Sequence, residues 1–439
     1  MNTTGPQASG EALYRRTAWY LLLPIAGVTL VNGVDRLNVS FAGPPMSLDI
    51  GLSPTRFGLG VSVFFIAYLL FQYPHALLLR KVGIRCWLLL SMAVWGVAGI
   101  LMSRLRGPGD FYTARFVLGL GEAGFAPGMT WYISQWTPLA TRARAMAVAL
   151  SAVPLSLVVG GPLCGVLLGM HNPLGIAPWR WMFLVSTVPN FVMAVTAALY
   201  FVDRPSRAFW LKGETGRQLE AAIAAEASTV TARTPGFAAA CRDARIWLCA
   251  VVWFLVMTGA YALTYWLPQM VRQMAFTHSE ALIGILSALP QAGLVAGLFL
   301  NARHSDRRGE RRMHTAAGAL LAGLALAVAV FLPPGAMAFA LLVVTGFGLG
   351  ATQGVFWALP AALGIGGGQA PVGVIAAISM AGTTGGIVGP LLLGRLLEAS
   401  GSHRAGILVL AGFLILGALL LTLRRETDRE AFDGSTSTL

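Results

Sequence analysis

The stretch "DRRGERRM", residues 306–313, lies between two long apolar runs and decides the fold. A related stretch, "RKVGIRCW" (80–87), also lies between two apolar runs, earlier in the chain. Gly83 and Gly309 align in the two stretches. A short basic loop between apolar runs is typical of two consecutive membrane spans joined on the cytoplasmic side.

A second pair of motifs repeats at almost the same distance. "GGPLCGVLLG" (160–169) resembles "VGPLLLGRLL" (388–397), with Pro162 aligned to Pro390. Because two independent motif pairs share nearly one offset along the sequence, we predict a duplicated unit.

The composition indicates that lipid is the main solvent of this chain. Of its 439 residues, 56% are hydrophobic and 11% are charged, and the mean hydropathy is +0.70. Soluble domains have about 25% charged residues. A helix needs about 20 apolar residues to cross a bilayer, and runs of that length recur along the whole chain. We therefore predict an all-α membrane protein with twelve spans, at residues 17–41, 57–79, 86–104, 110–134, 144–169, 179–202, 245–270, 280–302, 313–332, 335–363, 370–397 and 402–423.

The basic residues set the predicted orientation. If the N-terminus is cytoplasmic, most Lys and Arg fall on the inner side and few on the outer side. This bias predicts that both termini are cytoplasmic, because basic residues are enriched in cytoplasmic loops. The 29 Arg against 2 Lys hint at a bacterial genome, and we expect the bacterial inner membrane.

One long polar segment divides the spans six and six. It contains "GETGRQLEAAIAAEA", which is suited to a short amphipathic surface helix. The predicted organisation is an N-terminal tail (1–16), a first six-helix bundle (17–202), a cytoplasmic linker (203–244), a second six-helix bundle (245–423) and a C-terminal tail (424–439).

The pattern D-R-x-G-x-R-R at 306–312, doubled across twelve spans, resembles the major facilitator superfamily. Within it, "VDRLNVSFA" (34–42), "GLSPTRFGLGVSVFFIAYLLF" (51–71) and "ARFVLGLGEAGFAPGMTWYISQW" (114–136) resemble the anion–cation symporter family. The resemblance implies twelve helices in two six-helix bundles. It also implies transport of organic anions such as sugar acids, tartrate or aromatic carboxylates, usually together with protons.

Four charged residues lie inside predicted spans: Asp35 and Arg36 in the first, Arg115 and Glu122 in the fourth. Each costs about 2.5–3.5 kcal/mol at the bilayer centre, so each must face a partner or water. The helical rise places Asp35 and Arg36 roughly 8–9 Å below the outer surface and Glu122 about 18 Å below it. Arg115 and Glu122 are seven residues apart and share one helix face. We predict that the four side chains converge.

These four residues predict a site for an anion and protons. A carboxyl group removed from water can exchange a proton when a guanidinium partner moves, and Arg grips a carboxylate through two parallel hydrogen bonds. As a hypothesis, Asp35 and Glu122 bind protons, while Arg36 and Arg115 attract the anion or gate the carboxylates. The resemblance implies the same assignment. A buried salt-bridge cluster that only locks helices together is the alternative.

The resemblance also implies candidates for the substrate pocket. Tyr68 matches a family position that faces the central cavity, and the second half offers similar candidates, namely Tyr261, Tyr265 and Trp357. Aromatic side chains in membrane helices also serve as packing or interface residues.

Three departures from the family pattern concern substrate choice. Gly33 stands where family members usually have Tyr, and Ser379 and Thr383 stand where they have a pair of Asn. These changes predict a roomier pocket with fewer hydrogen bonds, which favours a less hydroxylated or aromatic carboxylate. In "FQYPHA", His75 lies at a predicted cytoplasmic helix end, where we expect a surface residue.

The two basic loops are predicted to act as latches that form in one conformational state. The candidate gating residues are Arg80, Gly83, Arg85, Asp306, Arg307, Gly309 and Arg311. Arg80 stands where the second copy has Asp306, so an acid able to cap a neighbouring helix is present in only one copy.

Three other functions are weighed against a proton-coupled symporter. An organophosphate–phosphate antiporter usually has a basic residue in span seven, and "WLCAVVWFLVMTGAYALTYW" has none. A carboxylate sensor would need a signalling region, for which the short tail leaves little room. The sequence has no Ser/His/Asp set, metal cluster or phosphate loop, which argues against an enzyme. We expect no cofactor, no metal and no nucleic-acid partner, and a monomer that binds a small organic anion and protons.

Overall fold

The structure is a computed structural model that describes residues 6–211, 213–229, 243–274, 277–365 and 372–423. The described part is helical, with no strand in these ranges. The first half contains α1 (Pro6–Ile50), α2 (Pro54–Ser103), α3 (Pro108–Glu122), α4 (Phe125–Ser134), α5 (Leu139–Leu150), α6 (Ala152–Gly169) and α7 (Pro178–Tyr200). The second half contains α10 (Ala244–Gln273), α11 (Glu280–Arg308), α12 (Arg312–Phe331), α13 (Ala336–Phe356), α14 (Leu359–Ala362), α15 (Val372–Ser400) and α16 (His403–Leu423).

The helices give twelve spans, six in each half. Within the described ranges, ten helical stretches are long and apolar enough to cross a membrane. One of them, α2, holds two spans, because Gly83 leaves the helical conformation with φ +77°. Another span is divided between α3 and α4, which are separated by Ala123 and Gly124. The predicted fold class, twelve helices in two six-helix bundles, is confirmed.

The first helix is longer than the sequence predicted. Its predicted span ends at residue 41, but α1 continues to Ile50 through Pro44 and Pro45. Proline is tolerated inside membrane helices because neighbouring groups satisfy the freed backbone carbonyls. Likewise, α5 begins at Leu139, before the predicted start of the fifth span at residue 144, so Arg142 lies within a helix rather than in a loop.

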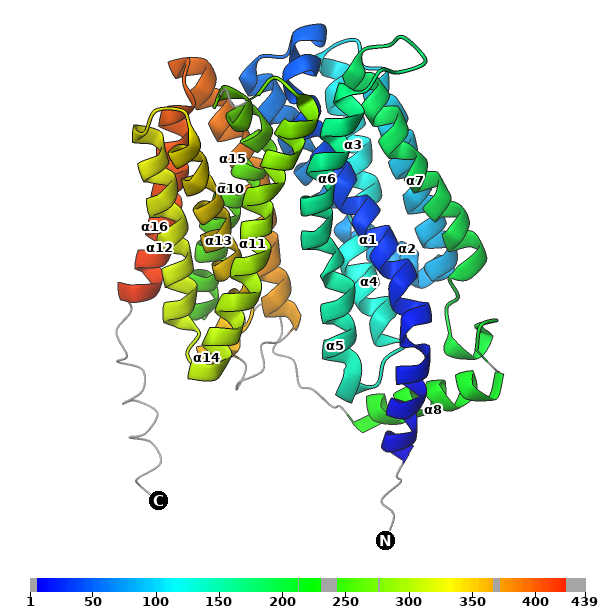
Figure 1. The fold of residues 1–439 in the computed structure, drawn as a ribbon. Helices are drawn as coiled ribbons and strands as arrows, with labels where there is room; N and C mark the ends of the chain where they lie inside the picture. Colours follow the sequence, from blue (N-terminus) through cyan, green and yellow to red (C-terminus); the bar gives the residue numbers. More distant parts are fainter. Residues whose placement is uncertain (1–5, 212, 230–242, 275–276, 366–371, 424–439) are drawn as a thin grey trace, which may run out of the picture. The chain divides into compact units, whose positions relative to one another are not determined.

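The segment between the halves contains the predicted surface helix. It begins with a short 3-10 helix, η1 (Pro205–Arg207), and continues into α8 (Gly213–Thr229). Figure 1 shows α8 beside the first turns of α1, and the two helices are in contact. The buried side chain of Leu219 provides the apolar face of α8.

The chain forms two compact units. Unit 1 contains residues 1–233 together with Thr264–Leu289 and Pro390–Glu398, and unit 2 contains the remaining parts of the second half. Parts of α10, α11 and α15 therefore pack with the first six spans. In unit 1, α2 packs on α3 and α7, and α1 packs on α6 and α7, whereas in unit 2 α12 packs on α13 and α16. The domain limits predicted from the sequence remain a prediction.

Close approach between α2 and α3 depends on glycine. A Cβ atom at Gly119 would overlap the carbonyl oxygen of Phe64. Small residues allow membrane helices to approach closely without a hydrophobic driving force. This contact places Arg115, one turn before Gly119, beside Gly60 and Phe64 of α2.

Candidate functional site

Arg36 and Glu122 form an ion pair between α1 and α3. Arg36 Nε donates a hydrogen bond to Glu122 Oε2 at 2.5 Å. Glu122 is completely buried, whereas the Arg36 side chain is 27% exposed. The other carboxylate oxygen, Oε1, makes no hydrogen bond of good geometry within the described residues, although Asn32 lies within reach of this carboxylate. The pair joins two residues that are 86 positions apart.

Arg115 is completely buried and has a different environment. Its Nε lies 3.4 Å from the carbonyl oxygen of Gly60, which is a long hydrogen bond. Neither of its terminal nitrogens makes a hydrogen bond of good geometry within the described residues. Glu122 lies within electrostatic reach and the Tyr265 side chain lies within hydrogen-bonding reach, but no carboxylate of the described chain forms an ion pair with Arg115. The two buried terminal NH2 groups thus have donors left for a carboxylate.

Asp35 contacts an amide rather than a guanidinium. Asn190 Nδ2, on α7, donates a hydrogen bond to Asp35 Oδ2 at 2.6 Å. Asp35 is 4% exposed. Together with Arg115 it lines a small cavity of about 10 Å³, which is room for about one water molecule. The cavity connects the carboxylate of α1 with the guanidinium of α3.

Aromatic rings cover both guanidinium groups. The Arg36 Cζ lies 5.0 Å from the ring centre of Tyr68 and 5.4 Å from that of Phe64. The Arg115 Cζ lies 4.7 Å from the same Phe64 ring and 6.0 Å from that of Tyr265. Such cation–π contacts stabilise a desolvated cation by about 0.5–2 kcal/mol. The predicted pocket residues Tyr68 and Tyr265 are therefore part of the charged cluster, and Phe64 lies against both cations.

The first helix continues beyond the predicted span. Because α1 reaches Ile50, Asp35 lies about 22 Å from the end of its helix. The predicted depths of Asp35 and Arg36 in the membrane stay predictions. The four charged side chains converge as predicted.

The other residues predicted to line the substrate pocket lie in unit 2. Trp357 is 40% exposed and makes an edge contact with Trp253, with ring centres 5.0 Å apart. Ser379 and Thr383 are half-buried one turn apart on α15, and the Thr383 hydroxyl donates to the Ser379 carbonyl oxygen at 3.0 Å. Tyr261 is half-buried on α10.

The first basic loop is capped from a distant part of the chain. The backbone N–H of Ile84, which follows Gly83, donates to Asp203 Oδ1 at 2.7 Å. A Cβ atom at Gly83 would overlap this carboxylate. Arg85 Nε donates to the carbonyl oxygen of Ala198, and Arg80 is exposed. The acid that the first loop itself lacks is supplied by the residues after α7.

The second basic loop is capped locally. Glu310 accepts hydrogen bonds from the backbone N–H groups of Met313 at 2.6 Å and His314 at 3.1 Å. Partial burial works to raise the pKa of Glu310, but these hydrogen bonds and the His314 ring lower it overall. Asp306 pairs with Arg311 at 2.5 Å, and its capping of a neighbouring helix stays a prediction. Arg307 and Gly309 are exposed, and Gly309 has φ +65°.

Two further expectations from the sequence are wrong. The space left by Gly33 is not open, because a Cβ atom there would overlap the Ser156 hydroxyl on α6. His75 is not a surface residue: it is 8% exposed and its Nδ1 accepts a hydrogen bond from the Trp87 indole at 3.1 Å. The helices pack closely at both positions.

Four residues in or near the site were not predicted: Asn32, Phe64, Asp203 and Asn190. Asn32 and Phe64 lie four residues before Arg36 and Tyr68, and thus on the same helix faces, so the spacing could have predicted them. Asn190 could also have been predicted, because it is an amide within an apolar span. For Asp203 the sequence gives none, because its partner Ile84 is 119 positions away.

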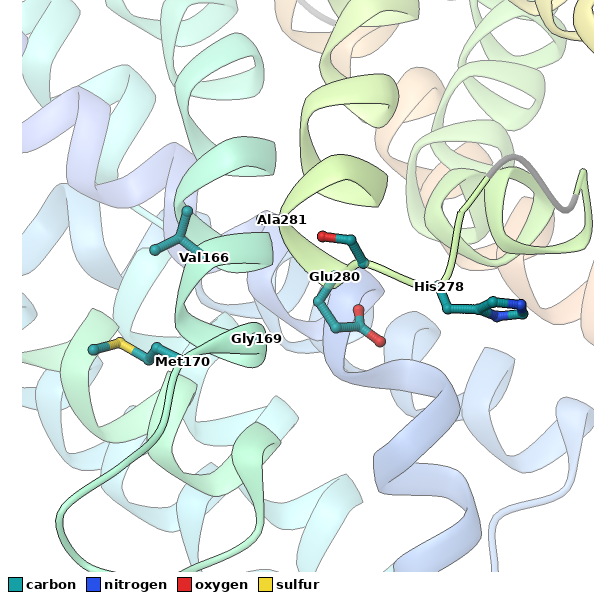
Figure 2. Close-up of a pocket in the computed structure, with 7 residues that line it drawn as sticks. Val166, Gly169, Met170, His278, Glu280 and Ala281 are labelled. Atoms are coloured by element: carbon teal, nitrogen blue, oxygen red, sulfur yellow. The ribbon is translucent and has the colours of Figure 1, made fainter.

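An open cleft of about 510 Å³ lies apart from these residues, at the end of α6 and the start of α11. Figure 2 shows Val166 and Met170 on its α6 side and His278 and Glu280 on its α11 side. Glu280 forms a two-point ion pair with Arg272. No residue predicted for transport lines this cleft. Among the described residues, no cluster of three or more His, Cys, Asp or Glu is placed to hold a metal ion.

The chain matches a known protein family. Residues 25–364 match the Major Facilitator Superfamily. The chain is similar to a protein of Agrobacterium vitis named "Putative tartrate transporter", with 36% identity over 97% of this chain and 94% of the relative. It is also similar to an Acinetobacter baumannii protein named "Quinolone resistance transporter", with 34% identity over 92% of this chain and 93% of the relative.

A solved structure has the same fold. The crystal structure of a bacterial homologue of the human lysosomal transporter Spinster superposes with a TM-score of 0.76. The alignment covers 92% of this chain and 96% of that one, at 17% sequence identity. This likeness concerns the arrangement of the helices alone.

Proposed function

This chain belongs to the major facilitator superfamily and is a multi-pass membrane transporter rather than an enzyme, and on that premise we propose that it carries a small carboxylate together with protons. The proposed cycle is alternating access, in which two six-helix bundles expose a central site to one side of the membrane and then to the other. The basic loops at residues 80–85 and 306–311 act as latches in that cycle.

The environment of Arg115 is the observation that carries the proposal. This guanidinium is completely buried, and neither terminal nitrogen makes a hydrogen bond of good geometry within the described residues. A buried cation without an ion-pair partner is costly. A substrate carboxylate would accept two parallel hydrogen bonds from it and remove that cost. Tyr265 and Tyr68, beside the two guanidinium groups, then contact the substrate.

Asp35 and Glu122 are the proposed proton-binding groups. Glu122 is bound by Arg36, so a proton on Glu122 would release Arg36 to bind the anion. Asp35 lines the small cavity beside Arg115, so its charge affects the same anion site. Proton binding and anion binding would thus favour each other, which is the coupling that symport requires.

The substrate is proposed to be a carboxylate with few hydroxyl groups. The relative named for tartrate and the relative named for quinolone resistance both support an organic acid, since quinolones are aromatic carboxylic acids. In the second half, the side chains proposed to contact substrate are Tyr261, Trp357, Ser379 and Thr383. Short hydroxyls replace amides at the last two of these positions, which supports fewer hydrogen bonds to substrate.

The proposed location is the cytoplasmic membrane of a bacterium, with both termini in the cytoplasm and the transporter working as a monomer. The excess of basic residues on one side of the predicted spans supports this orientation.

Uptake by purified protein in proteoliposomes tests the proposal. A panel of labelled tartrate, a sugar acid, phthalate and a quinolone is offered with and without an imposed inward proton gradient. We expect at least one of these acids to accumulate only with the gradient. Glu122→Gln should abolish the accumulation and retain substrate exchange, whereas Asp35→Asn should reduce both.

Asp110→Asn is the matched control, because Asp110 is an exposed acid on the same helix as Glu122. It should accumulate substrate as the parent protein does. Undiminished proton-driven accumulation by Glu122→Gln would overturn the assignment, and failure of every acid in the panel to enter would overturn the substrate class.

A further inference from the structure

We propose that Asn190 is a positioning residue for Asp35. The Asn190 amide keeps a hydrogen bond to the Asp35 carboxyl group in both protonation states: its N–H donates to the ionised form, and its oxygen accepts from the protonated form. The inference rests on the proposed function, because it concerns the proton that Asp35 carries. No sequence motif drew attention to Asn190, which lies in an apolar span after Pro189.

The geometry supplies the first half of the argument. Asn190 is completely buried, and its Nδ2 donates to Asp35 Oδ2 at 2.6 Å. Its other polar atom, Oδ1, has no hydrogen-bond partner within the described residues. Buried amide oxygens are nearly always paired, so an unpaired one calls for a physical explanation.

The chemistry of the two groups supplies the second half. An ionised carboxylate only accepts hydrogen bonds, whereas a carboxylic acid also has one O–H donor. A side-chain amide has both donors and an acceptor. When Asp35 takes up a proton, its new O–H can donate to Asn190 Oδ1 once the amide turns over about its Cβ–Cγ bond. The unpaired oxygen is then the acceptor for the protonated state.

Glu122 differs because its ion pair is with Arg36, although the Asn32 amide also lies within reach of its carboxylate. A guanidinium has donors but no acceptor. A proton on Glu122 therefore breaks that contact, whereas a proton on Asp35 replaces one hydrogen bond by another. The two carboxyl groups thus respond differently to a proton: Asp35 keeps its place and Glu122 releases its partner.

Other groups also act on Asp35. The charged or titratable side chains near it are Glu122 and Arg115 from α3 and Cys164 from α6. From α2 and α7, the neighbours in the described part are Trp95, Phe183 and Asn190, which do not titrate. A change at Asn190 leaves all of these charges in place, so its effect can be separated from theirs.

Infrared difference spectroscopy of purified, substrate-free protein during a pH titration tests this inference without any transport assay. The carboxylic-acid C=O band that is lost in Asp35→Asn identifies Asp35. In Asn190→Leu this band should move to higher frequency, because the acid loses its hydrogen-bond acceptor. Its titration midpoint should move to higher pH by about one unit, since the ionised form loses the stronger, charge-assisted bond.

Two variants serve as controls. Asn190→Gln keeps the amide and should restore the parent midpoint and frequency in large part. Ser186→Ala removes a buried hydroxyl from α7 one turn away and should change neither. If folded Asn190→Leu keeps the parent frequency and midpoint, or if Asp35→Asn removes no band, the inference is overturned. Either result is independent of whether a carboxylate is taken up in the proteoliposome assay.

Discussion

The two halves of the chain repeat the same order of spans but bury different chemistry. Among the described residues, the buried carboxylates and guanidinium groups are those of Asp35, Arg115 and Glu122, all in the first half. The buried polar side chains of the second half are mostly hydroxyls, together with Gln291 and His403. Thr258, for example, donates to the carbonyl oxygen of Phe254 one turn back on its own helix. A hydroxyl can be satisfied within its helix, whereas a charged group needs another helix or a ligand. We infer that charge is handled by the first half and that the second half supplies neutral contacts.

The largest expected effect comes from removing the unpaired cation of the first half. Arg115→Met should lower carboxylate uptake by more than about 100-fold, because a desolvated guanidinium–carboxylate contact is worth several kcal/mol. Arg115→Lys should restore little, since lysine lacks the planar fork. Initial uptake rates in proteoliposomes measure both variants.

Arg395→Gln is the control for this prediction, because Arg395 is an exposed arginine of the second half. It should transport at the parent rate. Parent-like uptake by Arg115→Lys would show that a fork-shaped cation is not required.

The second effect concerns the stability that the Arg36–Glu122 ion pair contributes to the first half. Arg36→Met leaves a buried carboxylate without its ion-pair partner and should lower the free energy of unfolding by about 3–5 kcal/mol. The double variant Arg36→Met, Glu122→Met removes both charges and should recover most of the loss. Thermal unfolding in detergent measures this difference. A double variant less stable than the single one would contradict it.

A smaller effect distinguishes the caps of the two basic loops. Asp203→Asn and Glu310→Gln each weaken a helix cap and should each cost about 1 kcal/mol of stability. Because the pKa of folded Glu310 is lowered, its contribution is present above the unfolded value of about 4.3 and is lost as the pH falls through the folded value. Glu310→Gln should therefore reduce the pH dependence of stability in that acidic window by the share of this one carboxylate.

Unfolding curves measured at neutral pH and between about pH 3 and 5 provide the measurement. A Glu310→Gln protein with the same acid sensitivity as the parent would contradict the prediction.

The smallest expected effect concerns a residue of the second half. The Thr383 hydroxyl already donates to its own helix, so Thr383→Val should change stability by less than about 0.5 kcal/mol. As a proposed substrate contact it should raise KM by about 2–10-fold, the value of one neutral hydrogen bond. Concentration dependence of uptake separates KM from kcat, and an unchanged KM would remove Thr383 from the proposed site.

The fold could be predicted from the sequence because the length of an apolar run and the placement of basic residues are local properties. The twelve spans and the surface helix α8 follow from them. The ends of helices could not be read in the same way. Pro44 and Pro45 look like a stop signal, yet α1 continues past them because membrane packing tolerates proline.

The site was only partly predictable for a related reason. Helical spacing shows which residues share a face, so Arg115 and Glu122 could be grouped before their surroundings were known. It does not show which helix packs against that face. The contacts of Asn190 with Asp35, of Asp203 with Ile84 and of Arg36 with Glu122 span 155, 119 and 86 positions of the chain.

The ring of Phe64, which lies against both Arg36 and Arg115, has a consequence for how the cluster survives a change of charge. Carboxylates are counter-ions that acid can remove, but the negative face of a benzene ring persists at every pH. When Glu122 is neutralised, Arg36 therefore still contacts an electron-rich surface. In this arrangement of the helices, neither guanidinium depends on a carboxylate alone for stabilisation.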